Sequence, residues 1–262
     1  NSPTYTALLI ESMKYAYADR SKYLGDPEFF DVPVQSLISK EYAKKIYKKI
    51  KLNLITPSEK IFPGSELEYE SIDTTHFSVA DKNGNIVSNT YTLNSGFGSG
   101  VVIDGTGILM NNEMDDFVSA PGVPNQFGLI GGEANKIEPF KRPLSSMTPT
   151  IVLKKGKPIY ATGSPGGSRI ISTVLQFLLN TLVFNMEISD ATVVPRIHHQ
   201  WKPDVVMLET GFDIQHANEI ESLGQKIYFS GPGTALESIE IKNGLFYGFG
   251  DTRRPDSKAK GL

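Results

Sequence analysis

Apolar residues recur at helical spacing at the start of the chain. This stripe follows Ser2-Pro3, a typical helix start, and predicts a helix over residues 4–20. Ser39 is a candidate N-cap for a second helix over residues 40–51. The many lysines of that second helix are expected to form a solvated face.

The pattern becomes strand-like from residue 74 onward. Residues 74–80 and 86–93 are rich in Thr, Val and aromatic side chains, which favour β-strands. Asn83-Gly84 lies between the two runs and is a strong short-range hairpin signal. We therefore predict an antiparallel hairpin here.

The register of this hairpin depends on the length of its loop. If Asp81 pairs with Asn85 around a three-residue loop, Thr74 lies directly opposite Thr92. A two-residue loop would instead place Thr75 opposite Thr92. The pattern of residues leaves both registers open.

The rest of the chain mixes strand-like and helical segments, and 262 residues suit one large α/β or α+β unit. Residues 56–65 indicate an extended linker, and residues 119–143 a long loop of the kind that often forms a lid or binding loop. The remaining predicted elements are a hairpin over 150–162, a helix opened by GSPGGSR at 163–169 with apolar residues from Ile170 to Leu182, a short helix N-capped by Ser189, and strands around one short helix over 204–250.

Composition describes a globular chain. Of its 262 residues 39% are hydrophobic and 21% charged, which argues against disorder. A formal charge of −3 gives no electrostatic reason to expect nucleic acid or a membrane as partner. The absence of cysteine excludes disulfides, thiolate metal sites and a cysteine nucleophile. The chain begins with Asn1 rather than Met, which leads us to expect a processed chain or an excised piece.

Single motifs give weak chemical signals. The histidines lack the spacing of a zinc site, and HHQW at 198–201 is expected to be packed, hydrogen-bonded structure. GSPGGSR at 163–169 places glycines at a helix N-terminus, as phosphate loops do, but lacks the Walker and dinucleotide patterns. Its backbone N–H groups could equally form an oxyanion hole.

Six motifs taken in order are more specific than any one of them. They are DTTHFSV at 73–79, TYTLN at 90–94, LMNNEMDDF at 109–117, KRPLSSMTPTIV at 141–152, GSPGGSR at 163–169 and PRIHHQW at 195–201. Together they closely resemble the gamma-glutamyltranspeptidase family (glutathione hydrolases), over nearly the whole chain. YAYADRSKYLGDP at 15–27 resembles the end of that family's large subunit.

The resemblance implies an α+β fold, the four-layer αββα fold of an N-terminal-nucleophile hydrolase, made as a zymogen that cuts itself before a threonine. The cut would fall between Asp73 and Thr74. Residues 1–73 would then be the C-terminal part of the large subunit with its linker. Residues 74–262 would be the small, catalytic subunit.

Such a cut makes chemical sense for Thr74. A threonine hydroxyl is a poor nucleophile unless a base lies beside it. Cleavage frees an α-amine on the same residue, and its ordinary pKa of ~7.7–8.0 lets it take the hydroxyl proton near neutral pH. No separate histidine is required. The alternative is that Thr74 is only a strand residue of high β-propensity.

The resemblance also implies roles for other residues. Thr92 is similar to the family's second threonine, which hydrogen-bonds the nucleophile, and Gly166 and Gly167 are similar to its oxyanion hole. Residues 121–133 resemble the lid loop, with Phe127 where several relatives have Tyr. The residues that resemble those binding the α-amino and α-carboxylate ends of the γ-glutamyl group are Asn94, Glu113, Asp116, Ser145 and Ser146.

The implied substrates are glutathione or related γ-glutamyl compounds, with water or an amino acid or peptide as acceptor. No metal or organic cofactor is implied. The family's carboxylate-binding arginine comes from the first half of the large subunit, so we expect that missing N-terminal portion as a partner. The resemblance also suggests a periplasmic or secreted protein.

Two alternatives remain open. One keeps the chemistry and changes the substrate, as in a glutaryl-cephalosporin acylase or a poly-γ-glutamate transpeptidase. The apparent lid at 121–133 favours small γ-glutamyl substrates over a polymer. The other is a truncated, non-catalytic form that lacks the N-terminal half.

Overall fold

The computed structural model describes residues 2–61 and 74–261, which mix helices and strands as the predicted α+β class requires. Asp73 and the last part of the predicted linker lie outside the described residues. The chain divides into two compact units. Unit 1 comprises Asn1–Glu70, Glu113–Ser145 and Ile197–Ser230, and unit 2 comprises Ser71–Asn112, Ser146–Arg196 and Gly231–Leu262.

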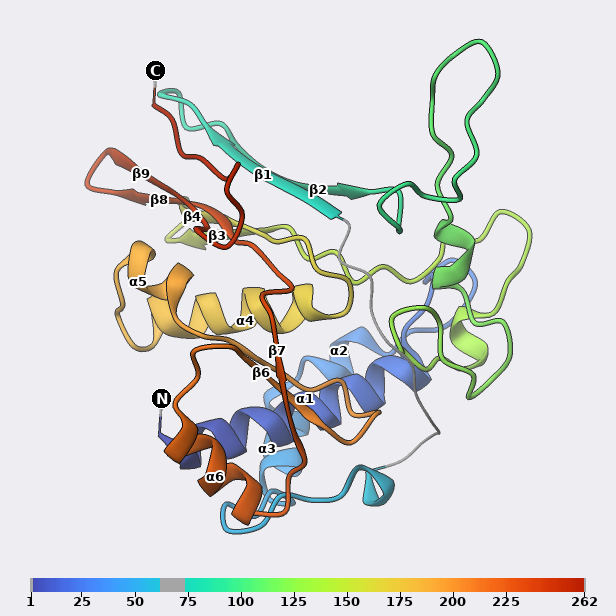
Figure 1. Cartoon of the computed structure of the whole chain (residues 1–262), viewed down its shortest axis with the longest axis vertical. Helices are drawn as coiled ribbons and strands as arrows, with labels where there is room; N and C mark the ends of the chain where they lie inside the picture. The colour runs from blue at the N-terminus through green and yellow to red at the C-terminus, as the bar shows by residue number, and fades with distance from the viewer. Residues whose placement is uncertain (1, 62–73, 262) are drawn as a thin grey trace. The chain divides into compact units, whose positions relative to one another are not determined.

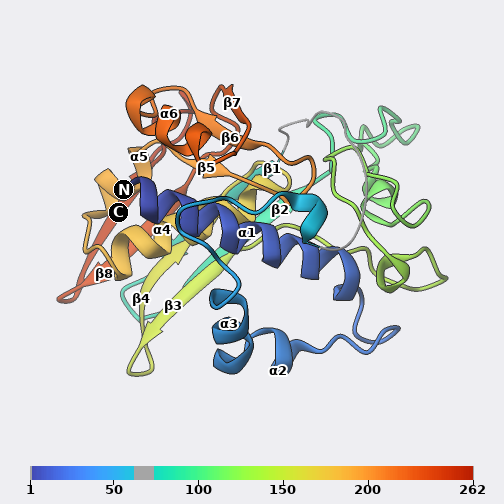
Figure 2. The same ribbon diagram turned by 90° about the horizontal axis from the view of Figure 1, so that it is seen from below.

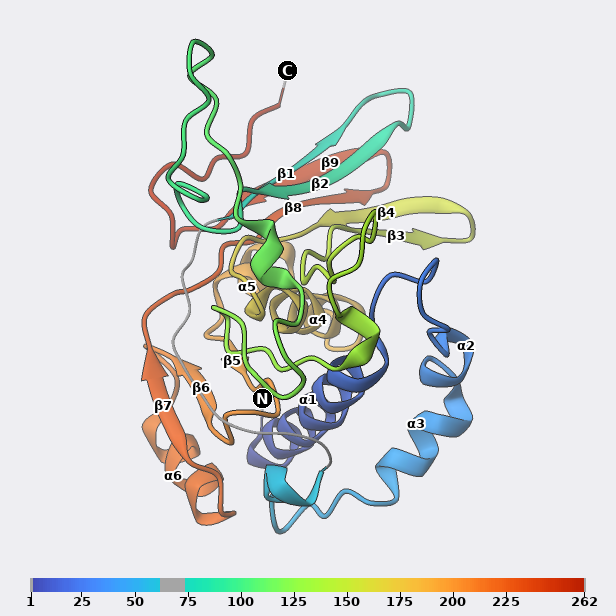
Figure 3. The ribbon, with the colours of Figure 1, turned by 90° about the vertical axis from the view of Figure 1, so that its right-hand side faces the viewer.

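Unit 2 consists of three layers, which Figures 1 and 3 show as two sheets followed by helices. The hairpin of β1 and β2 packs on a sheet of order β3-β4-β8-β9, and α4 and α5 cover that sheet's other face. Its elements are β1 (Thr74–Ala80), β2 (Ile86–Thr92), β3 (Thr150–Lys154), β4 (Lys157–Thr162), α4 (Arg169–Leu182), α5 (Ile188–Val193), β8 (Glu237–Lys242) and β9 (Leu245–Gly250).

The core of unit 2 lies between α4, α5 and the four-stranded sheet. Tyr160 of β4 meets Phe177 of α4 edge to face, with 5.9 Å between the ring centroids. Ile188, Ala191 and Leu236 complete this buried cluster. The sheet–sheet–helix order matches three layers of the predicted αββα sandwich.

The outer face of the β1–β2 hairpin is apolar and exposed. Phe77, Val79, Val87 and Tyr91 expose 43%, 52%, 48% and 56% of their surfaces. Alternate residues of a strand point to opposite faces, so the side chains between them turn toward the second sheet. This outer face is where the fourth, helical layer of the predicted order would lie.

The hairpin adopts the first of the two predicted registers. Thr74 pairs with Thr92, and the loop is closed by a bond from the Asp81 amide to the Asn85 carbonyl at 3.0 Å. The Asp81 carboxylate selects this loop because it accepts the backbone N–H groups of Asn83 and Asn85, both at 2.9 Å.

Unit 1 contains a long N-terminal helix, α1, which contacts α6 and η3, while α2 and α3 lie to one side (Figure 2). A small sheet of order β5-β6-β7 and the helix α6 belong to the same unit. Its elements are α1 (Pro3–Tyr23), α2 (Val34–Leu37), α3 (Lys40–Tyr47), η1 (Ser58–Lys60), η2 (Glu113–Asp116), η3 (Glu133–Asn135), β5 (Ile197–His198), β6 (Val206–Glu209), α6 (Ile214–Ser222) and β7 (Ile227–Ser230).

Capping residues in the sequence predicted some helix boundaries correctly and others not. The hydroxyl oxygens of Ser2 and Ser39 cap α1 and α3 as predicted. However, α3 ends at Tyr47 rather than residue 51, because it buries no residue and lacks packing that would extend it. The prediction that Ser189 caps the next helix was wrong. Helix α5 begins at Ile188, before Ser189, because Ile188 packs in the buried core of unit 2.

The HHQW run is packed and hydrogen-bonded, as predicted. His198 bonds the side chain of Gln200 at 2.9 Å, and His199, Gln200 and Trp201 are buried. Among the described helices, none combines the length and apolar character needed to cross a bilayer.

Candidate active site

Thr74 is the first residue of β1 and is nearly buried, with 9% of its surface exposed. Its hydroxyl donates to Oγ1 of Thr92, 3.4 Å away on the opposite strand. The backbone N–H of Asn94 donates to the same Thr92 oxygen at 2.9 Å. The bond from the Asn94 amide fixes the position of the Thr92 oxygen, and that oxygen orients the Thr74 hydroxyl.

Asn94 is held in a left-handed conformation, with φ of 77°, directly after β2. Its side-chain amide donates to the carbonyl of Asn112 at 3.2 Å, and the Asn112 side chain accepts from the Ser95 amide at 3.0 Å. The sequence analysis did not single out Asn112. These bonds hold the chain beyond β2 at a fixed angle to the Thr74–Thr92 pair.

The two glycines of the GSPGGSR loop have positive φ angles, a region that glycine adopts most readily. The φ angles of Gly166 and Gly167 are 130° and 54°. A Cβ atom on Gly166 would lie 2.4 Å from Cγ2 of Thr234 and 2.6 Å from the carbonyl oxygen of Gly233. The loop therefore packs its backbone directly against 233–234.

The same loop begins beside β1. A Cβ atom on Gly163 would lie 2.2 Å from the ring of His76, which is two residues beyond Thr74 on the same face. The ring bonds the Thr90 hydroxyl at 2.7 Å, and burial lowers the pKa of His76 to about 4. His76 is therefore neutral near pH 7 and acts as a packing element between the strand and the loop.

We expect Gly166→Ala to lower the free energy of unfolding by more than Gly84→Ala does. Both glycines have positive φ, but added Cβ atoms meet no neighbour at Gly84, whereas at Gly166 they overlap backbone. Unfavourable backbone conformations cost about 1–3 kcal/mol each, and the overlap adds to that at Gly166. Urea unfolding of the two variants measures the difference. Equal losses would show that the close contact with 233–234 is unimportant.

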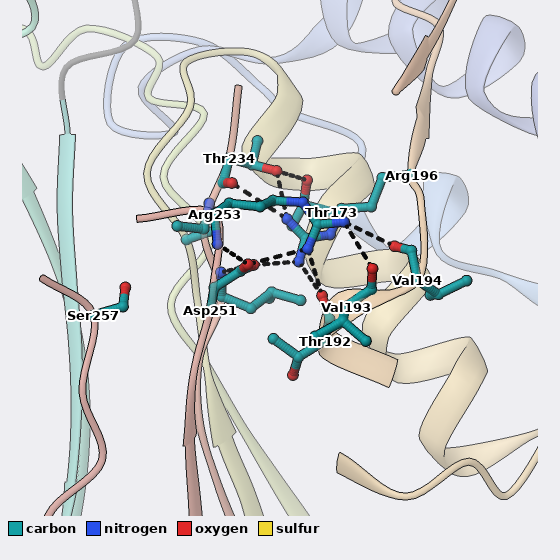
Figure 4. A network of polar contacts seen from close by, with 12 residues as sticks. Thr173, Thr192, Val193, Val194, Arg196, Thr234, Asp251, Arg253 and Ser257 are labelled. Carbon is teal, nitrogen blue, oxygen red and sulfur yellow. Dashed lines mark hydrogen bonds and ion pairs between the residues drawn. The ribbon is translucent and has the colours of Figure 1, made fainter. Parts of the chain in front are cut away.

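A buried ion-pair network lies behind this loop (Figure 4). The Asp251 carboxylate accepts from the guanidinium groups of Arg196 and Arg253, at 2.5 and 3.0 Å. Although burial raises the pKa of Asp251, the charge and hydrogen bonds of Arg196 hold it below its usual value. Arg253 also bonds the carbonyls at the end of α5, including Thr192 at 2.9 Å.

This network connects to both parts of the candidate site. Arg196 donates to the Thr234 hydroxyl at 2.8 Å, and Thr234 is the side chain on which Gly166 packs. Arg254 follows the network directly and donates to the carbonyl of Thr74 at 3.4 Å. The sequence analysis did not find Thr234 or Arg254, because these contacts join positions far apart in the chain.

Unit 1 contains a second group of candidate residues. Asp116 lies at the end of η2, where burial raises its pKa to about 7. The negative charge of Glu113, which shares a hydrogen bond with it, acts in the same direction, and the positive charge of Arg20 opposes this. Arg20 and Asp116 line one small cavity together with Asn125. Asp116 is the carboxylate of the cavity lining, and Glu113 shares a hydrogen bond with it.

The serine pair falls at a boundary along the chain, where a segment of unit 1 ends and a segment of unit 2 begins. Ser145 is exposed and closes the middle segment of unit 1, and Ser146 is half-buried and opens the next segment of unit 2. The structure thus brings Thr74, Thr92 and Asn94 together within unit 2. It brings Glu113 and Asp116 together within unit 1.

The predicted lid loop, residues 121–133, is compact and internally bonded. The side-chain oxygen of Asn125 accepts from the amides of Phe127 and Leu129, at 3.0 and 3.1 Å. Phe127 is only 6% exposed, and its carbonyl accepts from Gln200 at 3.0 Å. Within 2–61 and 74–261, no three His, Asp or Glu side chains are grouped so that they could hold a metal ion.

Comparison with solved structures places this layered fold in the class of N-terminal-nucleophile hydrolases. A cephalosporin acylase from Bacillus halodurans superposes with a TM-score of 0.80 at 26% identity, covering 100% of this chain and 46% of that one. A gamma-glutamyltranspeptidase from Pseudomonas nitroreducens superposes with a TM-score of 0.68 at 42% identity, covering 72% and 98%.

Within that class, the chain belongs to the gamma-glutamyltranspeptidase family, whose profile matches residues 1–261. It is 51% identical over 255 residues to the glutathione hydrolase proenzyme of Escherichia coli (strain K12), covering 97% of this chain and 44% of that protein. It is 36% identical over 264 residues to the Bacillus subtilis (strain 168) proenzyme, covering 94% and 43%. The chain therefore spans less than half the length of these curated relatives.

Proposed function

We propose that this chain carries the catalytic threonine of an enzyme that transfers γ-glutamyl groups. The observation that carries the proposal is the Thr74–Thr92 pair, with 3.4 Å between the two hydroxyl oxygens at the start of β1. Thr74 becomes the nucleophile when the bond after Asp73 is cut, which makes residues 74–262 the small subunit. The matched P. nitroreducens chain supports this boundary, since 72% of 262 residues is about 189, the length of 74–262.

The first half-reaction forms an ester. The free α-amine of Thr74 takes the proton from its hydroxyl, and Oγ1 attacks the γ-carbonyl carbon of the donor. The backbone N–H groups of Gly166 and Gly167 stabilise the oxyanion that forms on the carbonyl oxygen. The C–N bond then breaks, the leaving amine takes the proton from the ammonium, and a γ-glutamyl ester remains on Thr74.

The second half-reaction returns the enzyme to its starting state. Water, or the amine of an amino acid or peptide, gives a proton to the Thr74 α-amine and attacks the ester carbonyl. The C–O bond to Oγ1 breaks, and the proton returns to the threonine oxygen. The products are glutamate or a new γ-glutamyl amide.

The charged ends of the donor set its orientation. Asp116 and Glu113 bind the α-ammonium, because two neighbouring carboxylates supply the counter-charge and acceptors it needs. The side-chain amide of Asn94 also contacts these charged ends of the γ-glutamyl group. The hydroxyls of Ser145 and Ser146 donate to the α-carboxylate. Residues 121–133, with Phe127, close over the bound glutamyl group.

Glutathione and related γ-glutamyl compounds are the proposed donors. The names of the curated relatives support this choice over a cephalosporin substrate, since the solved acylase is only 26% identical to this chain. The N-terminal portion that the relatives have is the proposed partner chain, because it would complete the large subunit. We also propose a periplasmic or secreted location, by likeness to the family.

The test is to trap the acyl-enzyme. The chain is expressed together with the N-terminal portion of its relatives, mixed briefly with glutathione and quenched in acid. Mass spectrometry should find a small subunit that begins at Thr74 and carries one γ-glutamyl group on it. A group attached elsewhere, or steady turnover with no labelled Thr74, would contradict the proposal.

The pH dependence of kcat/KM should report two groups. Asp116 must be ionised to bind the ammonium, and its raised pKa of about 7 means that it is protonated, and unable to do so, at lower pH. The Thr74 amine must also be neutral, with an ordinary pKa of ~7.7–8.0. Below pH 6.5 we expect log(kcat/KM) to rise with a slope approaching 2, and in Asp116→Asn with a slope of 1. If Asp116→Asn kept the slope of the parent, Asp116 would not be one of the two groups that bind or activate the donor.

A further inference from the structure

We infer that a buried polar cluster in unit 1 holds the two subunits together after the chain is cut. This inference rests on the proposed cleavage before Thr74. We call the cluster the Lys14 lock. Its members are Glu11, Lys14, Thr56, Ser58, His199, Trp201 and Asp204.

Lys14 is the centre of the lock and is only 1% exposed. Its ammonium donates to the carbonyl of Thr56 at 2.9 Å and forms an ion pair with Oδ1 of Asp204 at 2.7 Å. The second carboxylate oxygen of Asp204 accepts from the Ser58 amide at 2.8 Å. The carboxylate of Glu11 accepts from the Thr56 amide at 2.6 Å. The backbone of 56–58 is thus held by three side chains.

Two residues of the HHQW run close the lock from the other side. His199 is fully buried, and its Nε2 lies 3.3 Å from Oδ1 of Asp204. Trp201 is 1% exposed, and its indole N–H donates to the carbonyl of Ser58 at 3.1 Å. Figures 2 and 3 show the η1 turn, which includes Ser58, beside α1.

The proposed cut divides the lock between the two subunits. Glu11, Lys14 and the segment 56–58 precede Thr74, whereas His199, Trp201 and Asp204 follow it. A backbone hydrogen bond from the Ile55 amide to the Leu223 carbonyl, at 2.9 Å, also joins a residue before the cut to one after it. Unit 1 is therefore one compact body made from both products of the cut. Once the chain is cut, only non-covalent contacts such as these keep it together.

The charges in the lock depend on one another. Burial lowers the pKa of Lys14, and its hydrogen bond and ion pair with Asp204 oppose that effect. Burial would raise the pKa of Asp204, but the bonds from His199, Lys14 and Ser58 bring it below its usual value. Lys14 is buried and the Asp204 side chain is 37% exposed, so removing Asp204 leaves a buried charge without compensation, and removing Lys14 leaves a half-buried one. The lock should therefore contribute strongly to subunit affinity.

A second charged contact across the proposed cut has a more exposed cation. Arg142 donates to the Asp26 carboxylate at 2.7 and 2.9 Å, but the arginine side chain is 65% exposed. The Asp26 side chain is buried, but solvent around the exposed arginine weakens the attraction between the two charges. We therefore assign the main polar contribution to the Lys14 lock.

The test separates the lock from self-cleavage. The full chain, expressed with the N-terminal portion of its relatives, carries Thr74→Ala and a protease recognition sequence within residues 62–73. An added protease then makes the cut. Size-exclusion chromatography in a urea series measures the separation of the two pieces for the parent, for Lys14→Met and for Lys22→Met. Lys22 is the matched control because it is an exposed lysine on the same helix.

In cut Lys14→Met the two pieces should separate at lower urea, corresponding to a dissociation constant raised on the order of 10²-fold. Cut Lys22→Met should behave like the parent, and uncut forms should stay single species with the parent's circular dichroism. Asp204→Asn, which keeps the Lys14–Thr56 bond, should show about a tenfold effect, and it decides the matter if Lys14→Met misfolds uncut.

The proposal would be wrong if, after protease cleavage, the Lys14→Met and Asp204→Asn variants held their two pieces together as tightly as the parent does. Failure of the proposed function would appear elsewhere, as a chain with intact Thr74 that never cuts itself. The protease-cut experiment reports on the lock in either case.

Discussion

Thr74→Ala is expected to abolish both self-cleavage and turnover. Cleavage needs the Thr74 hydroxyl to attack the Asp73 carbonyl, and turnover needs it to attack the donor, so both steps lose their nucleophile. The Thr92 oxygen, 3.4 Å away, cannot take over, because it lacks an adjacent α-amine and is itself bonded by the Asn94 amide. The variant, expressed with the N-terminal portion of its relatives, should run as one uncut chain. Hydrolysis of γ-glutamyl-p-nitroanilide should fall to background.

Two further variants make this result specific. Thr74→Ser keeps a hydroxyl and should still cut and turn over. Thr75→Ala removes the neighbouring threonine, which is exposed on the opposite face of β1, and should behave like the parent. Recovery of two subunits from Thr74→Ala, by gel and intact mass, would eliminate Thr74 as the nucleophile.

The β1–β2 hairpin was predictable because its determinants are local. Asn83-Gly84 indicates the turn, and Asp81 lies close enough in sequence to bond the loop amides with its own carboxylate. These interactions fix the Thr74–Thr92 register without help from the rest of the chain. The sequence left two registers open only because the same residues can also close a two-residue loop.

The parts that could not be predicted depend on contacts between distant segments. Thr234 supports Gly166 and Arg254 bonds the Thr74 carbonyl, but about seventy and 180 positions separate these partners. Ser189 is a good N-cap by type, yet α5 begins at Ile188 because that side chain is buried in a core assembled from several elements. Contacts of this kind do not correspond to any short-range pattern of residues, so the sequence alone does not predict them.

Asp116→Ala is expected to raise KM for γ-glutamyl-p-nitroanilide far more than it changes stability. The substitution removes a counter-charge to the substrate ammonium, so a loss on the order of 10²-fold or more in kcat/KM is expected. The raised pKa of about 7 means that the fold disfavours the ionised carboxylate, so above pH 7 this charge lowers the stability of the free protein. Its removal should therefore leave the melting temperature at pH 8 unchanged or slightly higher.

A raised KM with an unchanged melting temperature distinguishes a binding role from a structural one. A carboxylate that mainly stabilised unit 1 would instead lower the melting temperature and leave KM unchanged when removed. Asp104→Ala is the control, since Asp104 is exposed in a glycine-rich loop and should change neither KM nor melting temperature. Arg20 lies near Asp116 and loses part of its counter-charge in Asp116→Ala, which offsets part of the expected gain in stability. A collapsed melting temperature with unchanged KM would show that Asp116 serves the fold and that the ammonium binds elsewhere.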